Sequence, residues 1–177
     1  MQKDTIFALS TPQGVGGVAV IRISGPQAQA ALQTLFQPAG TSPMEPRKLI
    51  YGRFVFDGTQ IDDGMAVLFC APASYTGEDS AELHCHGSLA VVQQLLGALG
   101  TLPGLRPAEP GEFTKRAFLH GKMDLSQAEA VMDLIGAEGL AAARQSLSQL
   151  HGTLFAKVDG LCDALTLALA GIEAGLD

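Results

Sequence analysis

Hydrophobic and polar positions divide the chain into two parts with different periods. In the first part, short runs rich in Val, Ile and Phe are separated by Gly, Pro and Asp, a pattern typical of strands joined by turns. Asp57-Gly58 lies between two such runs and predicts a tight hairpin turn. The predicted strands are residues 5–9, 17–24, 48–56, 64–70 and 80–86.

Two segments of this first part repeat their apolar residues at helical spacing instead. The first predicted helix opens at Pro26, which a first helical turn tolerates, and runs to about Phe36. Residues 89–99 form the second predicted helix. Strands and helices are therefore mixed, and we expect residues 1–120 to form an α+β (mixed) domain. The buried face of the first helix is expected to be Ala28, Leu32, Leu35 and Phe36.

Residues 121–177 have a purely helical pattern and are expected to be a separate helical segment. Ser126 and Glu129, three positions apart, form a capping-box pattern that predicts the start of a helix. Further on, an apolar stripe predicts one long amphipathic helix that needs a partner, either a second copy or sequence outside these 177 residues. The stripe consists of Leu147, Leu150, Leu154, Val158, Leu161, Leu165, Leu169, Ile172 and Leu176.

Composition excludes some classes of function. The chain is 47% hydrophobic and carries a formal net charge of −7, so a broad basic face for nucleic acid is not expected. The acidic helical segment argues against direct RNA binding on charge grounds. Between Arg106 and Lys122 lie four basic residues and two acidic ones, a modest cationic region where an anionic small ligand would be favoured.

Cysteine usage and the N-terminal residues indicate the compartment. Cys70, Cys85 and Cys162 are odd in number and form no CxxC pair, so a disulfide framework is not expected. The first residues lack the pattern of a signal peptide, and no stretch approaches the ~20 apolar residues of a membrane span. We therefore expect a cytoplasmic protein.

Glycines at Gly14, Gly16 and Gly17 raise the question of a phosphate-binding loop. Such loops follow a strand and open a helix, whereas these glycines precede the predicted strand, and no GxxxxGK[ST] motif occurs. Two interpretations stay open: a tight turn alone, or positive φ angles and a close backbone approach by a flat ligand.

Three side chains stand out as candidates for chemistry. Arg22 interrupts an apolar strand, so its charge requires a partner, an edge position open to solvent, or a ligand carboxylate or amide. Glu82, with His84 and His86, is expected on one face of its strand. This cluster favours a carboxylate that reads a ligand or pairs with a cation, and less strongly a metal site. Lys122 stands at the domain junction, a frequent ligand position, although alone it reads as a solvated lysine.

Three longer motifs carry a resemblance to a known family. They are TPQGVGGVAVIRISG at residues 11–25, YTGED at residues 75–79 followed by Glu82 and a His-Gly pair, and PGEFTKRAFLHGKMDLSQAEAVMDLI at residues 110–135. Together they closely resemble the N-terminal part of the MnmE (TrmE) family of bacterial tRNA modification GTPases, over essentially the whole chain.

That resemblance implies a fold, a ligand and partners. The fold would resemble tetrahydrofolate-dependent aminomethyltransferases and be followed by the first helices of a helical domain. The N-terminal domain would bind 5-formyltetrahydrofolate as a one-carbon donor and form a homodimer. The full protein, with its partner MnmG, would add a carboxymethylaminomethyl-type group to the wobble uridine of certain tRNAs. Its GTPase domain, which uses GTP, Mg²⁺ and K⁺, is not in this sequence, so we expect no activity from this chain alone.

The resemblance also assigns residues. The folate contacts of the family correspond by motif to Arg22, Glu82 and Lys122, with Gly14, Gly16 and Gly17 as possible loop contacts. It implies no catalytic residue and no metal site in this part of the protein. Two alternatives remain: a purely structural dimerisation module without a ligand, and a metal-dependent hydrolase that uses Glu82, His84 and His86.

Overall fold

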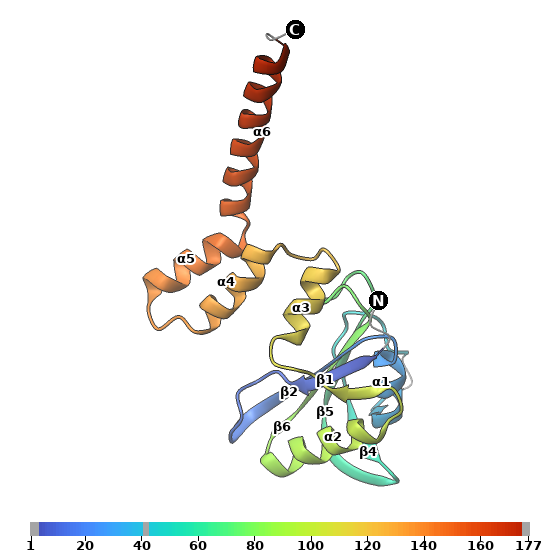
Figure 1. Cartoon of the computed structure of the whole chain (residues 1–177). Helices are drawn as coiled ribbons and strands as arrows, with labels where there is room; N and C mark the ends of the chain where they lie inside the picture. Colours follow the sequence, from blue (N-terminus) through green and yellow to red (C-terminus); the bar gives the residue numbers. More distant parts are fainter. Residues whose placement is uncertain (1–3, 41–42, 175–177) are drawn as a thin grey trace. The chain divides into compact units, whose positions relative to one another are not determined.

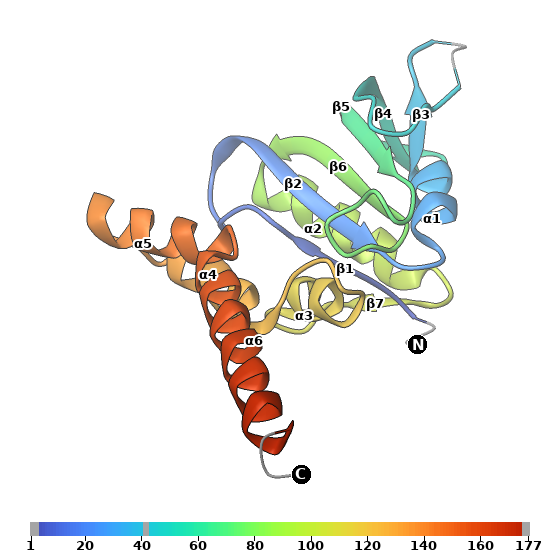
Figure 2. The same ribbon diagram turned by 90° about the horizontal axis from the view of Figure 1, so that it is seen from above.

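A seven-stranded mixed sheet forms the centre of the first of two units. The computed structural model describes residues 4–40 and 43–174, and the chain divides into the units Met1–Lys122 and Met123–Asp177, which are described separately. Across the sheet the strand order is β3-β4-β5-β6-β2-β1-β7 (Figure 2), antiparallel except for the β1–β7 pair. The strands are β1 (Thr5–Leu9), β2 (Gly16–Ser24), β3 (Phe36–Pro38), β4 (Ile50–Phe56), β5 (Thr59–Phe69), β6 (Ser80–Gly87) and β7 (Leu105–Pro107).

Two helices, α1 (Ala28–Leu35) and α2 (Leu89–Thr101), pack against the sheet and enclose the hydrophobic core (Figure 1). Strands β2 and β6 follow the period of two, with alternate residues buried on the side of the core. The intervening residues, Arg22 of β2 and Glu82 of β6 among them, therefore lie on the opposite face of the sheet. The inner residues of these two strands are Ala19, Ile21, Ile23, Ala81, Leu83 and Cys85.

The sequence-based elements of this unit are confirmed, with shifts at their ends. The strand predicted at residues 5–9 is β1, and Asp57 and Gly58 form the predicted two-residue turn with positive φ angles of 49° and 73°. Helix α1 ends at Leu35, one residue early, because Phe36 opens the short edge strand β3. A third helix, α3 (Glu112–Leu119), precedes the unit boundary.

In the second unit, the prediction of one continuous helix through Leu147 and beyond is wrong. The structure has α4 (Leu125–Ile135), α5 (Leu140–Leu150) and α6 (Thr153–Ala174), and the break between α5 and α6 falls at Gly152, whose φ is 74°. A left-handed residue ends a helix, and the apolar spacing continues across the break without revealing it. Leu176 lies outside the described residues.

Most of the predicted apolar stripe on α6 is exposed in this structure. Val158 to Ile172 includes five stripe residues that are 52–64% exposed, which matches the expectation that the stripe needs a partner. The five residues are Val158, Leu161, Leu165, Leu169 and Ile172.

Among the helices that the structure describes, none is long and apolar enough to cross a membrane.

Helix α4 begins with a capping box, but its members differ from the predicted pair. The Asp124 side chain accepts a hydrogen bond from the backbone N–H of Gln127 at 2.8 Å, and the Gln127 side chain accepts one from the backbone N–H of Asp124 at 2.8 Å. Ser126 instead donates to Asp124 at 2.7 Å. The prediction of a capping box was correct, but it placed the cap at Ser126, two residues after the observed cap Asp124. Asp caps a helix as well as Ser does, so both residues fitted the pattern.

Replacing this cap tests the corrected start of α4. In Asp124→Ala the first turn of α4 loses its reciprocal bonds, so its backbone amides should exchange with solvent faster, as measured by hydrogen–deuterium exchange. Glu129→Ala is the matched control, because Glu129 belongs to the pair predicted from sequence and makes no capping bond here. Faster exchange in Glu129→Ala than in Asp124→Ala would contradict the assignment.

Candidate functional site

Arg22 and Glu82 form an ion pair on the face of the sheet away from α1 and α2. They lie directly opposite each other in the β2–β6 register, and Arg22 Nε and Nη2 lie 3.0 and 2.9 Å from Glu82 Oε1. Their side chains are 26% and 18% exposed, so the charges are partly withdrawn from water. Strand β2 lies between β1 and β6, which excludes an edge position, and Glu82 is the partner within the chain that the charge of Arg22 requires.

Two aromatic rings flank the Arg22 guanidinium, and we call Tyr75 and Phe113 the aromatic clamp. The guanidinium carbon lies 5.1 Å from the centroid of Tyr75 and 5.6 Å from that of Phe113, within the range of cation–π attraction. Tyr75 belongs to the β5–β6 loop and Phe113 to α3, and a hydrogen bond of 2.9 Å between the hydroxyls of Tyr75 and Thr114 joins the two segments. The clamp restricts the orientation of Arg22.

Glu82 extends the pair toward His84 on the same face of β6. His84 Nε2 lies 3.4 Å from Glu82 Oε2, close enough for an ion pair but without hydrogen-bond geometry, so this buried nitrogen has no hydrogen-bond partner in the described chain. The contact with His84, and next the charge of Arg22, lower the pKa of Glu82 against the opposing effect of burial. Glu82 is therefore a carboxylate acceptor at neutral pH.

A cavity of about 310 Å³ adjoins this row of polar side chains, with His84 in its wall. Its volume is at the lower end of the range for small-ligand sites, roughly 300–1,000 Å³. The lining mixes apolar and aromatic side chains with a few polar groups, as such sites require. The lining residues are Gly17, Val18, Tyr51, Asp63, Gly64, Met65, His84, Cys85 and His86.

The three residues of the metal hypothesis share a face as predicted, but they do not converge. His86 turns to Asp62, with its backbone N–H and its Nδ1 both 2.8 Å from that carboxylate. Glu82 is occupied by Arg22 and His84. Among the residues that the structure describes, no group of His, Cys, Asp and Glu is arranged to hold a metal ion, so the hydrolase alternative gains no support.

Lys122, which follows α3 in the chain, contacts the β5–β6 loop that carries Tyr75. Its ammonium donates to the carbonyl of Pro72 at 3.1 Å, and its aliphatic stem packs against Gly77, where an added Cβ would meet Lys122 Cδ at 3.3 Å. Among the described residues, no hydrogen bond or ion pair joins Lys122 to Arg22 or Glu82. The structure thus brings two of the three predicted residues together and attaches the third to the same loop.

The glycine loop fits its predicted role only in part. Gly14 has a φ of 151°, which confirms the expectation of a positive φ there, but Gly16 and Gly17 have none. Gly16 pairs with Gly87, where a Cβ would stand 2.5 Å from the Gly16 carbonyl oxygen, so the close backbone approach is between two strands. Gly17 lines the cavity beside His84.

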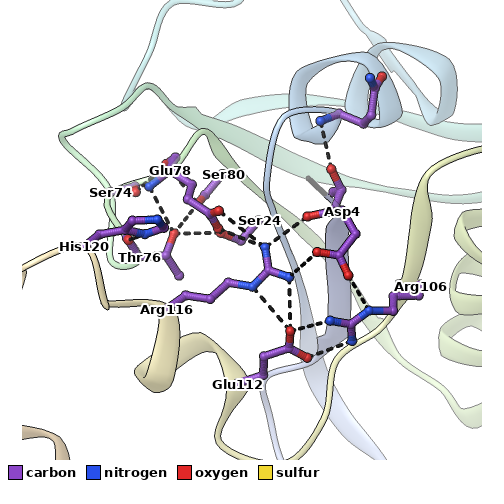
Figure 3. A network of polar contacts seen from close by, with 12 residues as sticks. Asp4, Ser24, Ser74, Thr76, Glu78, Ser80, Arg106, Glu112, Arg116 and His120 are labelled. Atoms are coloured by element: carbon purple, nitrogen blue, oxygen red, sulfur yellow. Dashed lines mark hydrogen bonds and ion pairs between the residues drawn. The ribbon is translucent and has the colours of Figure 1, made fainter. Parts of the chain in front are cut away.

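An ion network is centred on the buried side chain of Arg116 (Figure 3). Arg106 pairs with Asp4 and Glu112, and Arg116 pairs with Asp4, Glu78 and Glu112. The prediction of a cationic region between Arg106 and Lys122 is therefore wrong for both arginines, because the carboxylates of Asp4, Glu78 and Glu112 neutralise their charges.

Comparison with protein families identifies both units. Residues 5–122 match the model of the GTP-binding protein TrmE N-terminus, and residues 125–177 match that of the MnmE helical domain. The chain belongs to the MnmE (TrmE) family. Arg22, Glu82 and Lys122 all lie within the matched TrmE segment.

MnmE relatives resemble the chain along nearly all of its length. The tRNA modification GTPase MnmE of Parvibaculum lavamentivorans is 48% identical over 98% of this chain and 40% of its own, and that of Phenylobacterium zucineum is 51% identical over 99% and 38%. The mitochondrial 5-taurinomethyluridine-[tRNA] synthase subunit GTPB3 of Rattus norvegicus is 47% identical over 98% of this chain and 35% of its own. The chain thus spans about two fifths or less of these relatives.

Sequence reasoning missed the residues around Arg22 in this MnmE unit. Tyr75 and Phe113 fall inside the YTGED and PGEFTKR motifs, where only their aromatic character gave a signal. Arg116 has Glu112 four residues earlier on a short helix, a spacing that normally indicates an exposed surface pair. Here both side chains are almost fully buried.

The buried carboxylate of Glu112 predicts acid sensitivity. Hydrogen bonding to Arg106, foremost, lowers its pKa from 4.5 to about 2. A depressed folded-state pKa stabilises the fold above pH 4.5, and this contribution is lost as the pH falls toward about 2. In Glu112→Gln the free energy of unfolding, measured by urea titration, should therefore fall less steeply over this interval than in the parent.

Exposed Glu129→Gln provides the control and should keep the parent slope. If the free energy of unfolding of Glu112→Gln fell with pH as steeply as that of the parent, this carboxylate would not contribute to the pH dependence.

Proposed function

We propose that the first unit is a folate-binding and dimerisation module of a tRNA-modifying GTPase, with 5-formyltetrahydrofolate bound at the Arg22–Glu82 pair. The observation that carries the proposal is this partly buried ion pair, whose Arg22 guanidinium lies within cation–π distance of two aromatic rings. His84, two residues from Glu82 on the same face of β6, lines a cavity of about 310 Å³. Membership of the MnmE family supports it.

The chemistry of the pair suits a pterin. A pterin edge presents an amide and an amino group, for which Glu82 offers an ionised acceptor and Arg22 offers planar donors. Apolar and aromatic cavity walls suit the faces of a flat ring. Lys122 is the donor proposed for the carbonyl or carboxylate oxygens of the ligand, released from Pro72 on binding.

The wider role is proposed from the family. The fold would resemble tetrahydrofolate-dependent aminomethyltransferases, and the bound folate would serve as one-carbon donor. Within a homodimer that acts with MnmG, the full protein would add a carboxymethylaminomethyl-type group to the wobble uridine of certain tRNAs. GTP, Mg²⁺ and K⁺ would act at a GTPase domain outside these 177 residues, so this chain alone is not expected to be active. A cytoplasmic location is proposed with it.

Isothermal titration with 5-formyltetrahydrofolate tests the site. Arg22→Gln and Glu82→Gln should each weaken binding on the order of tenfold to a hundredfold, since each removes a charged hydrogen-bonding partner. Lys122→Met should weaken binding less, because Lys122 has no contact with the ion pair. Arg53→Gln on β4 is the matched control, because Arg53 is exposed on a strand that does not pair with β2. Melting curves check that each variant is folded.

Two results would contradict the proposal. An absence of binding heat in the parent, or parent affinity in both Arg22→Gln and Glu82→Gln, would reject the folate site. Light scattering then decides the alternative: a dimer without folate affinity is the result expected of a purely structural dimerisation module.

A further inference from the structure

Arg116 is the largest fully buried side chain among the described residues, with a relative exposure of 1%. A guanidinium removed from water must be paired on all sides, since an unpaired buried charge is very costly. Arg116 Nη1 donates to the Asp4 carbonyl at 3.0 Å and to both Glu78 oxygens at 3.3 Å. Its Nη2 donates to Asp4 Oδ1 and Glu112 Oε1, each at 3.0 Å. One side chain therefore connects three segments of the first unit.

Each connected segment is itself fixed to a further element (Figure 3). Glu112 is held by Arg106 of β7, and Asp4 precedes β1 in the sheet. Glu78 accepts a hydrogen bond from Ser24 of β2 at 2.9 Å. A well-packed apolar side chain would stabilise a core as well as such an ion network does, so stability alone does not account for it. What the network adds is a defined position for each segment.

Two of these segments carry the aromatic clamp. Tyr75 is three residues before Glu78 in the β5–β6 loop, and Phe113 is three residues before Arg116 in α3. The bonds between Arg116 and Glu78 thus join the same loop and helix that close on Arg22. Besides this tie, the hydroxyl bond between Tyr75 and Thr114 links the loop to α3, and His120 at the end of α3 donates from Nδ1 to the Thr76 carbonyl at 2.8 Å.

We infer that Arg116 is a positioning residue for ligand binding: through Glu78 and Glu112 it sets the spacing of Tyr75 and Phe113, and so the orientation of Arg22. The inference rests on the proposed folate site. A displacement of supporting groups by a fraction of an ångström weakens a binding site even when the contacting residues are unchanged. Loss of the network should therefore reduce affinity without any change in a residue that touches the ligand.

Tyrosine spectroscopy measures the clamp independently of folate. The chain has two tyrosines and no tryptophan, so Tyr51→Phe leaves Tyr75 as the sole fluorescent reporter. In this background, Arg116→Lys should increase acrylamide quenching of Tyr75 and weaken its near-ultraviolet circular dichroism, because one ammonium cannot reach all three carboxylates. Lys115→Gln, an exposed neighbour on α3, is the control and should leave both signals unchanged.

Affinity is measured separately with Tyr51 retained, since Tyr51 lines the cavity. The dissociation constant for 5-formyltetrahydrofolate should rise about tenfold in Arg116→Lys and in Glu78→Gln. Folded variants that melt at a lower temperature but keep the parent Tyr75 signals and affinity would overturn the inference, because a merely structural role predicts that result. If Arg116→Lys does not fold, Glu78→Gln decides by the same readings.

The two proposals fail differently. A parent that shows no folate binding rejects the folate site, and the Tyr75 signals then decide the positioning role of Arg116. A parent that binds folate, with unchanged Tyr75 signals and affinity in Glu78→Gln, rejects the positioning role and leaves the folate site standing.

Discussion

The burial of the Arg116 guanidinium is the constraint around which the first unit is organised. A charge that is withdrawn from water has to be met by carboxylates and carbonyls at fixed distances, and here they come from the start of β1, the β5–β6 loop and α3. The arrangement of these segments therefore depends on directional polar contacts, whereas the sheet and its two helices depend on ordinary hydrophobic packing.

This division of forces separates the scaffold from the site. Alternate residues of β2 and β6 face the core, and the residues between them face the side on which the loop and α3 lie. The Arg22–Glu82 pair thus stands on a rigid sheet, while the groups that surround it belong to segments held by ion pairs and hydrogen bonds. The sheet therefore places the ion pair, and the polar network places the groups around it.

The second unit shows a different balance. Helices α4 and α5 pack against each other, but the apolar stripe of α6 is largely exposed among the described residues. The chain covers about two fifths or less of the MnmE relatives with which it was compared. An exposed apolar stripe of this length is typical of an interaction surface.

Local sequence determined the elements that depend on short-range chemistry. The strands around Asp57-Gly58 and the motif at the start of α4 followed from alternation, turn residues and caps, although Asp124 rather than Ser126 is the cap. The need of Arg22 for a partner also followed, because a charge in an apolar strand is recognisable without a structure. Only the tertiary structure decided that this partner is Glu82 and that Tyr75 and Phe113 flank Arg22. It also decided that Arg116 is buried rather than exposed. The physical reason is that these contacts join residues far apart in the chain, and their energies arise only after packing has removed the groups from water.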